Sequence, residues 1–199
     1  MIKAILLGLV AVFGMLDGRW FGIAMLDRPL VMCTLVGVVM GDIRAGILIG
    51  ATLELVFLGV INIGAATPPD IVTSSVIASA FAISSGKGTE VALALAMPIA
   101  VLAQSLLILV RVGNSYFQHK AEIYASKGES HKVAMTHIQP IVLYAASMFI
   151  PVFLCIYFGE DIVNSILKFI PDKVIDGLQI AAGLMPALGF SMLINMMIS

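Results

Sequence analysis

The sequence predicts an all-α polytopic membrane protein in which full spans are combined with short helices that are broken or re-entrant. Of the 199 residues, 60% are hydrophobic and only 12% are charged, and the mean hydropathy is +1.08. A soluble domain is nearer to half apolar and a quarter charged. Several apolar runs approach or exceed the roughly 18 residues that a spanning helix needs. Residues 1–199 contain no soluble part and no linker, so we predict a single membrane-embedded domain.

The first apolar segment covers residues 4–16 and ends at a polar and aromatic patch, residues 17–20. Lys3 followed by an apolar run could imitate a signal peptide, but no A-x-A-like cleavage site follows. We therefore predict an uncleaved membrane helix. Residues 27–29, Asp-Arg-Pro, resemble a helix start, because Asp can cap free N–H groups and Pro is tolerated in the first turn.

The helix that starts at Pro29 and reaches Gly41 would cover only about 20 Å at 1.5 Å per residue. Since the hydrocarbon core of a bilayer is roughly 30 Å thick, this helix is predicted to be re-entrant or half of a broken helix. Residues 43–63 are long enough to span. Glu54 falls near the middle of that span, and Asn62 follows about two turns later on a similar face.

A second short segment covers residues 71–85, which are too few and too rich in serine for an ordinary lipid-facing span. The preceding sequence GAATPPD is predicted to break the chain, because paired prolines remove N–H donors and restrict the residue before them. Two short segments therefore flank one full span with a carboxylate at mid-depth. Discontinuous helices of this kind often build transporter sites, where open backbone groups hold solutes.

The rest of the chain contains three predicted full spans, at residues 91–112, 138–158 and 174–198. Residues 113–137 are the only extended polar part, and their spacing predicts a helix lying at the membrane interface. The Lys and Arg residues of this part place it on the cytoplasmic side under the positive-inside rule. Residues 161–170 are predicted to form a short interfacial helix.

Two pairs of glycines in the opening half have the small-xxx-small spacing that allows helices to approach closely. These pairs are Gly37 with Gly41 and Gly46 with Gly50, and packing is their predicted role. Asp42 lies between the pairs and is predicted either to be an interface residue or to cap the span that follows.

Composition also excludes several classes of function. The net charge of −1 and the absence of a basic stripe predict no nucleic-acid partner. Cys33 and Cys155 lie in apolar runs and are predicted to be buried free thiols. The three histidines lack zinc-ligand spacing, so no metal site is predicted. The segment SSGKG, residues 84–88, lacks the earlier glycine of a phosphate loop, and no ATP site or other cofactor is predicted.

The segments RPLVMCTLVGVVMGD and GILIGATLELVFLGVINIGAATPPD, within residues 28–70, carry a specific resemblance. The chain resembles the IIC (permease) subunit of the mannose–fructose–sorbose family of the bacterial phosphotransferase system. The similarity continues through residues 104–111, the region of His119 and residues 177–197. It therefore covers nearly the whole chain.

The resemblance implies a subunit that moves a hexose or amino sugar across the bacterial cytoplasmic membrane and carries no catalytic residues of its own. It implies a phosphoenolpyruvate-dependent system in which cytoplasmic IIA and IIB subunits phosphorylate the sugar as it enters. A IID membrane subunit is implied as partner, as are a trimer of IIC–IID pairs in the lipid bilayer and an elevator-like movement of a substrate-carrying core. Further hydrophobic sequence is expected beyond Ser199.

The resemblance does not identify a single sugar as the substrate. Mannose-type members usually have His-Arg-Pro-Leu where this chain has Asp27-Arg28-Pro29-Leu30. This departure leaves fructose, sorbose and N-acetylgalactosamine open beside mannose. The segment AGLMPALGF, residues 182–190, leans towards the amino-sugar branch.

Four polar residues are predicted to bind the sugar. A carboxylate at Glu54 in a low dielectric can accept two hydroxyl groups with charge-assisted strength; the alternative is a helix-packing Glu paired with Lys or Arg. Asn62 can donate hydrogen bonds to sugar hydroxyl groups and accept them, or it can form hydrogen bonds between two helices. Asp70 either faces the sugar or caps the next helix. Asp27 has the same two roles open, and its position in the family favours the site.

Two other functions compete with the permease. A vitamin-binding module of another uptake system fits the size but leaves the match at residues 28–70 unexplained. An intramembrane enzyme would use Asp42 and Asp70 as a carboxylate pair with separated proton affinities. The surrounding sequences GVVMGD and PPD match no protease pattern.

Overall fold

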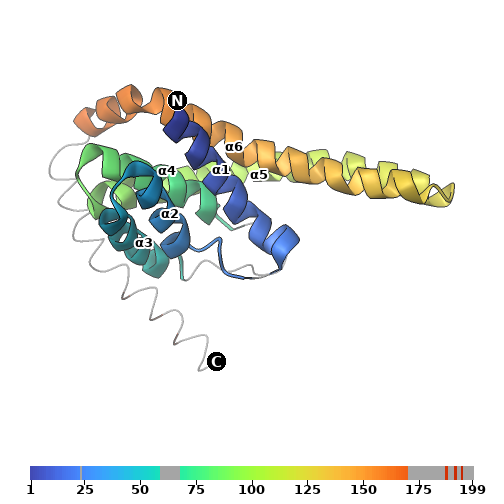
Figure 1. Cartoon of the computed structure of the whole chain (residues 1–199), viewed down its shortest axis with the longest axis horizontal. Helices are drawn as coiled ribbons and strands as arrows, with labels where there is room; N and C mark the ends of the chain where they lie inside the picture. Colours follow the sequence, from blue (N-terminus) through green and yellow to red (C-terminus); the bar gives the residue numbers. More distant parts are fainter. Residues whose placement is uncertain (23, 59–67, 170–186, 188–190, 192–193, 195–199) are drawn as a thin grey trace.

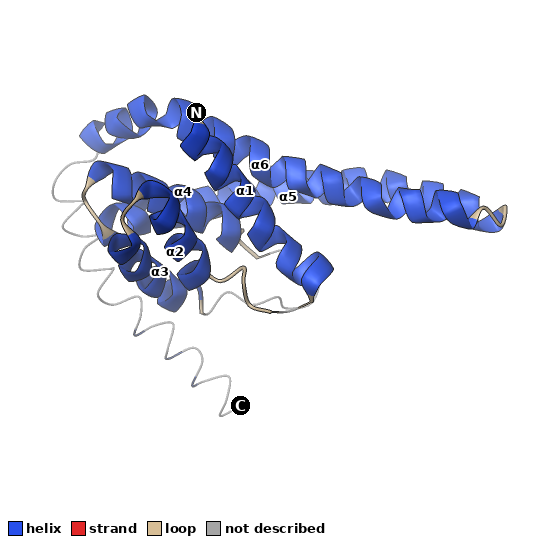
Figure 2. Cartoon of the chain, viewed as in Figure 1, coloured by secondary structure: helices blue, strands red, loops and turns tan. Residues whose placement is uncertain are grey.

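The computed structural model describes residues 1–22, 24–58 and 68–169, with the isolated residues 187, 191 and 194. The regular structure of this part is entirely helical (Figures 1 and 2), which confirms the predicted all-α class. The elements are α1 (Ile2–Leu16), the π-helical turn η1 (Asp17–Phe21), α2 (Pro29–Met40), α3 (Ile43–Phe57), α4 (Ile71–Ser85), α5 (Thr89–Ser126) and α6 (Ser130–Phe169).

Three stretches of the described helices are long and apolar enough to cross a membrane: Ile2–Phe21, Thr89–Ser126 and Ser130–Gly159. The two short apolar helices α2 and α4 match the two short segments predicted from the sequence. Pro29 occupies the first turn of α2, where its missing N–H would have no partner in any case. Gly41 ends α2 with a left-handed φ of 93°, so its role is that of a helix terminator rather than the predicted packing contact.

Of the span predicted over residues 43–63, the structure describes residues 43–58. Asp42 caps α3 as predicted, because its Oδ1 accepts a hydrogen bond of 2.9 Å from the backbone N–H of Ala45. The helix then ends at Phe57 after 15 residues, about 22 Å at 1.5 Å per residue. Residues 59–67, which include Asn62, lie outside the described residues, and so does most of the predicted last span.

The interfacial helix predicted over residues 113–137 is wrong. Residues 89–126 and 130–169 are two continuous helices of 38 and 40 residues, which pack side by side as a long hairpin that extends away from the other helices (Figure 1). The polar sequence forms the far end of this hairpin, because each helix supports the other there. Residues 161–169 continue α6 rather than forming a separate helix.

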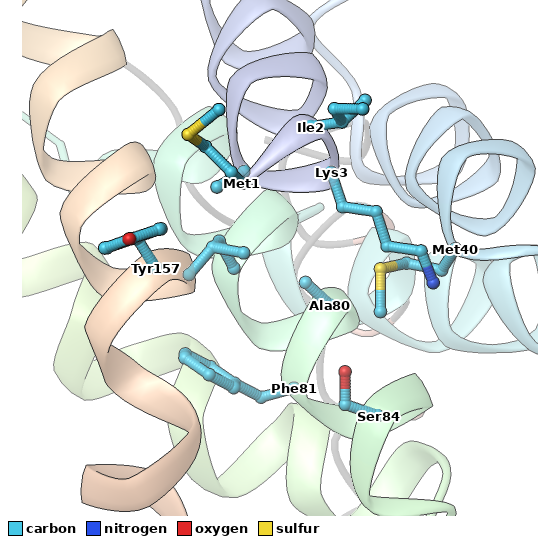
Figure 3. A pocket seen from close by; sticks show the side chains of 10 residues that line it. Met1, Ile2, Lys3, Met40, Ala80, Phe81, Ser84 and Tyr157 are labelled. Atoms are coloured by element: carbon cyan, nitrogen blue, oxygen red, sulfur yellow. The ribbon is translucent and has the colours of Figure 1, made fainter.

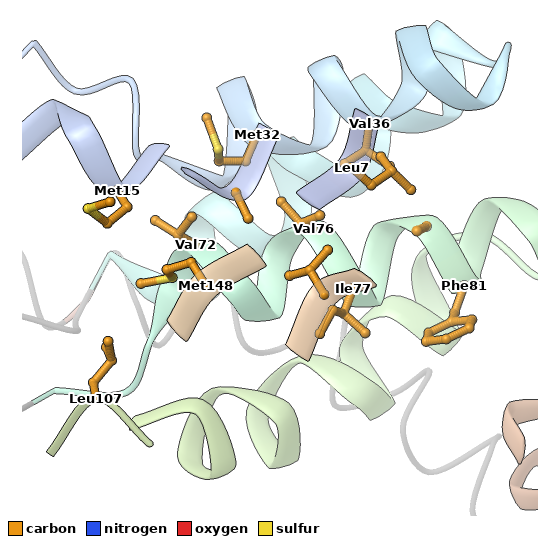
Figure 4. Packing of buried hydrophobic residues seen from close by; sticks show 13 residues of the cluster. Leu7, Met15, Met32, Val36, Val72, Val76, Ile77, Phe81, Leu107 and Met148 are labelled. Atoms are coloured by element: carbon orange, nitrogen blue, oxygen red, sulfur yellow. The ribbon is translucent and has the colours of Figure 1, made fainter. Parts of the chain in front are cut away.

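Helix α4 is the centre of the molecule. Every residue from Val72 to Ala82 is buried, and α4 packs on α1, α2, α3, α5 and α6. Its alanines and serines are small enough for neighbouring helices to approach closely. The hydroxyls of Ser74, Ser79 and Ser85 bond within the helix, as in the 2.6 Å hydrogen bond that Ser79 donates to the carbonyl of Ser75. Figure 4 shows Val76 of α4 between Leu7 of α1 and Met148 of α6, and Ile77 belongs to the same buried cluster.

Helices α2 and α3 pack together through glycines. A Cβ atom at Gly46 would lie 2.5 Å from the carbonyl oxygen of Cys33, and one at Gly37 would lie 2.7 Å from the carbonyl oxygen of Asp42. Gly50 likewise rests on the backbone of α2. Three of the four glycines singled out in the sequence therefore have the predicted packing role. As a result α2 and α3 form one tight unit.

Candidate functional site

Charged residues gather at the N-terminus of α2. Oε2 of Glu54 accepts a hydrogen bond of 3.2 Å from the backbone N–H of Leu30, and Oε1 lies 3.7 Å from Nε of Arg28. The close packing of α2 against α3 explains this meeting of residues 24 positions apart, because Gly50 contacts Pro29 and Leu30 one turn before Glu54. The arrangement joins a carboxylate to a helix N-terminus and to an arginine.

The carboxylate of Glu54 lies beside two sources of positive charge. Helix N-termini carry partial positive charge from unpaired N–H groups, and Arg28 adds a full positive charge. The ion pair corresponds to the alternative in which Glu54 is a helix-packing residue paired with a cation. The pair is nevertheless long, and the Glu54 side chain keeps 21% of its surface exposed. The carboxylate thus has lone pairs left to accept further donors.

Asp27 does not have the capping role that the sequence left open for it. The N-cap residue of α2 is Arg28, which makes no side-chain cap, and the N–H of Leu30 is instead satisfied by Glu54. Asp27 is half-buried directly before this cluster. Burial raises the pKa of the Asp27 carboxyl, and the nearby charge of Asp17 raises it further. Asp27 therefore has no capping role, and it directly precedes Arg28, the ion-pair partner of Glu54.

Asp70 caps α4, as one of its two predicted roles requires. Its Oδ1 accepts from the backbone N–H groups of Val72 at 3.1 Å and Thr73 at 3.5 Å. Its own backbone N–H donates to the carbonyl of Ala100 at 3.1 Å. Its Oδ2 is buried and has no hydrogen-bond partner in the described part of the chain. An unpaired buried acceptor is unusual, so this oxygen is open to a donor.

The structure places the predicted site residues at two helix starts. Asp27 directly precedes Arg28, which pairs with Glu54 of α3 at the N-terminus of α2, whereas the contacts of Asp70 are with α4 and α5. Asn62 lies outside the described residues. The geometry offers a carboxylate acceptor at the break before one short helix and a second acceptor at the break before the other. The two acceptors therefore lie at the N-termini of the short helices α2 and α4.

A family model described as "PTS system sorbose-specific iic component" matches residues 1–199. The chain belongs to this family.

Curated relatives of this IIC family include the mannose-specific EIIC component of Escherichia coli (strain K12), which is 40% identical over 171 residues, 85% of this chain and 64% of that protein. The fructose permease IIC component of Bacillus subtilis (strain 168) is 39% identical over 170 residues, 85% of this chain and 63% of that protein. N-acetylgalactosamine permease IIC component 1 of Escherichia coli (strain K12) is 28% identical over 178 residues, 89% of this chain and 67% of that protein. The chain thus spans less than two thirds of the length of the first two relatives.

A solved structure also has this fold. The cryo-EM structure of the mannose transporter ManYZ with microcin E492 contains a chain that matches with a TM-score of 0.75 at 36% identity. The match covers 100% of this chain and 80% of that chain. The helical membrane architecture of the IIC family is therefore confirmed for this chain.

The sequence did not predict that Arg28 and Asp17 contribute to the charged cluster at the N-terminus of α2. Arg28 was assigned only to a helix start, and its contact with Glu54 depends on tertiary packing. Asp17 was assigned only to a polar patch, but it is 1% exposed and accepts two backbone hydrogen bonds from the loop that leads to Asp27. A charged residue directly after an apolar run was the available signal.

Cavities in the described part of the IIC chain lie elsewhere. One of about 490 Å³ is enclosed by the N-terminal turn of α1, Met40, the C-terminal part of α4, and α6; Figure 3 shows Lys3 and Tyr157 at it. A second, of about 790 Å³, lies along the α5–α6 hairpin between Asn114 and Pro140. Neither is lined by Asp27, Glu54 or Asp70. The candidate sugar contacts are therefore carried by the helix breaks rather than by these cavities.

Proposed function

We propose that this chain is the sugar-translocating membrane subunit of a phosphoenolpyruvate-dependent phosphotransferase system. In this proposal the chain moves the sugar across the bacterial cytoplasmic membrane, and partner subunits phosphorylate it. The observation that carries the proposal is a carboxylate held at the start of a short membrane helix in a chain whose whole length matches the IIC family. Polar groups at membrane depth are by default candidates for a solute pathway.

Glu54 is the central sugar contact in this proposal. A sugar presents hydroxyl donors, and a carboxylate accepts them with charge-assisted strength. Glu54 accepts one hydrogen bond from the N–H of Leu30, and Arg28 lies 3.7 Å from its other oxygen, so lone pairs of the carboxylate remain for sugar hydroxyl groups. Asp27, Asp70 through its unpaired Oδ2, and Asn62 complete the proposed set. In this proposal Arg28 stays beside Glu54 until hydroxyl groups of the sugar reach the carboxylate.

Hexoses are the proposed substrates. The relatives named for mannose and fructose are 40% and 39% identical to this chain, whereas the relative named for N-acetylgalactosamine is 28% identical. These values favour mannose and fructose over the amino-sugar branch that residues 182–190 suggested, while sorbose stays open.

The proposed partners follow from the family. The matching chain of the mannose transporter belongs to a ManYZ complex, which supports a IID membrane subunit beside this chain. Cytoplasmic IIA and IIB subunits would carry the phosphoryl group, and a trimer of IIC–IID pairs is proposed. The tight packing of α2 on α3 supports their moving as one body in an elevator-like step.

The intramembrane enzyme finds no support in the geometry. Oδ1 of Asp42 bonds to the N-terminus of α3 and that of Asp70 to the N-terminus of α4. The two carboxylates therefore serve separate helices, whereas acid–base catalysis by a carboxylate pair needs a shared site.

Uptake measurements test the proposed function. Cells that express this chain with its IID, IIA and IIB partners are given radiolabelled mannose, fructose, sorbose, N-acetylgalactosamine and a vitamin such as riboflavin. We expect at least one sugar to accumulate in phosphorylated form, and only when the phosphoryl-donating subunits are present. Accumulation of unmodified sugar without those subunits, or uptake of the vitamin alone, would contradict the proposal.

Replacing Asp70 by Asn separates its two roles. Asn caps helices about as well as Asp, so we expect the amount of assembled protein to stay unchanged. The exchange replaces one carboxylate oxygen by an amide NH2 group, which donates instead of accepting, and it removes the negative charge from the other oxygen. We expect sugar uptake per assembled complex to fall by about tenfold, since one charge-assisted hydrogen bond is worth roughly 1.5–3 kcal/mol. Normal uptake would show that Asp70 is a cap and nothing more.

A further inference from the structure

The carboxylate of Asp17 is buried at the end of α1 and bonds to a single loop. Its Oδ1 accepts from the backbone N–H of Ala24 at 3.1 Å, and its Oδ2 accepts from the backbone N–H of Leu26 at 3.2 Å. The residue is 1% exposed. Burying a carboxylate is costly unless hydrogen bonds compensate. Both oxygens of this costly group are therefore used to fix residues 24–26.

The loop that Asp17 fixes has a strained backbone. Gly22 has a φ of 85°, and Met25 has a φ of 59°, which is the one positive φ of a non-glycine residue in the described part of the chain. Left-handed geometry costs a non-glycine residue free energy and persists only where surrounding contacts impose it. The two hydrogen bonds to Asp17 bracket Met25 and supply such contacts.

This loop leads directly into the charged cluster. Leu26, whose N–H is held by Asp17, is followed by Asp27 and then by Arg28, the residue that lies 3.7 Å from Glu54. A shift of the backbone at Leu26 therefore displaces Asp27 and Arg28 together. Glu54 is anchored separately, through α3 and its hydrogen bond with Leu30.

We propose that Asp17 is a positioning residue of the sugar site, which sets the place of Asp27 and Arg28 relative to the Glu54 carboxylate. This inference rests on the proposed function. Asp17 itself does not contact the sugar; it acts through the loop. The neighbouring Arg19 has a different task, because it donates to the carbonyl of Met15 and lies over the ring of Tyr144, 4.3 Å from its centroid. Arg19 thus ties the same turn to α6.

The test is sugar uptake by Asp17→Asn in the full transporter with its partner subunits. The probe is the better transported of radiolabelled mannose and fructose. Asn keeps one acceptor oxygen but turns the second into an amide that opposes an N–H. We expect the apparent KM to rise by about tenfold, the effect of one lost charge-assisted hydrogen bond, while Vmax per assembled complex changes little. Asp42→Asn is the matched control, and we expect it to leave KM unchanged.

A triple variant separates positioning from a general loss of stability. The proposal has Asp17 act through Asp27 and Arg28, so Asp17→Asn should add little to the KM of a protein that already carries Asp27→Asn and Arg28→Gln, because effects on shared contacts are not additive. A full additional factor from Asp17→Asn in that background would overturn the proposal, and so would a wild-type KM for Asp17→Asn alone.

Assembly of the variants completes the test. Where Asp17→Asn fails to assemble, Asp17→Glu keeps both oxygens on a longer side chain, and we expect it to assemble with a raised KM. Failure of both to assemble would make Asp17 a folding determinant and overturn the inference. A normal KM for Glu54→Gln would instead overturn the sugar site itself, so the two failures are distinguishable.

Discussion

Glu54→Gln is expected to lower sugar uptake by roughly 10- to 100-fold, which corresponds to the roughly 1.5–3 kcal/mol of a hydrogen bond to a charged group. The amide oxygen of Gln can still accept from the N–H of Leu30, so the start of α2 keeps a partner and the protein is expected to assemble. What is lost is the negative charge that accepts hydroxyl donors and balances Arg28. Uptake kinetics in cells that contain the partner subunits measure the effect.

The control for this prediction is Thr52→Val on the same helix. Thr52 is half-buried, and its hydroxyl donates to the carbonyl of Leu48 within α3, so its replacement by Val of similar size is expected to leave uptake unchanged. Normal uptake by Glu54→Gln at normal protein level would assign Glu54 to helix packing. Loss of assembled protein in Glu54→Gln would point to the same conclusion, because a packing role predicts loss of structure rather than loss of affinity.

The parts of the fold that were predicted correctly depend on local signals. Pro29 starts α2 and Gly41 ends it with a left-handed φ, and Asp70 after two prolines starts α4. Each of these residues imposes its effect within one turn of the chain. The bounds of both short helices could therefore be derived without knowledge of their neighbours.

The parts that were predicted wrongly depend on tertiary packing. Residues 113–137 have the composition of an interfacial helix, but α5 and α6 support each other along their length and remain helical to Ser126 and from Ser130. Near the end of this hairpin, Lys132 pairs with Glu129 at 2.9 Å and lies 5.4 Å from the ring centroid of Tyr124. The contact of Lys132 with Tyr124 joins α6 to α5, and a contact between helices cannot be read from the periodicity of one segment.

In the candidate site, too, local sequence identified one residue, whereas its partners depend on tertiary packing. The position of Glu54 among apolar residues identified it as a polar group within the membrane region, and this signal is local. Its partners are Leu30 and Arg28, 24 and 26 positions earlier, and only the packing of α2 on α3 brings them together. The capping role considered for Asp27 accordingly belongs to Glu54, which no pattern at residues 27–29 could reveal.

Gly46→Ala is expected to destabilise the protein strongly. The new Cβ would lie 2.5 Å from the carbonyl oxygen of Cys33 and 2.9 Å from Cα of Gly37, and both are backbone atoms that cannot rotate away. Overpacking of this kind typically costs about 1–3 kcal/mol, which outweighs the gain of roughly 1 kcal/mol that Ala has over Gly in a helix. The amount of protein in the membrane and the apparent Tm of the purified protein measure the loss.

The matched control is Gly18→Ala in η1, where a Cβ would meet no atom within 4 Å. The same chemical change is expected there to leave the Tm unchanged or to raise it, so a difference between the two variants isolates the contact with α2. Separation of α2 from α3 would also withdraw Glu54 from Leu30 and Arg28. Any Gly46→Ala protein that does assemble is therefore expected to show a raised KM as well, and a stable variant with normal uptake would contradict the view that this helix pair holds the site together.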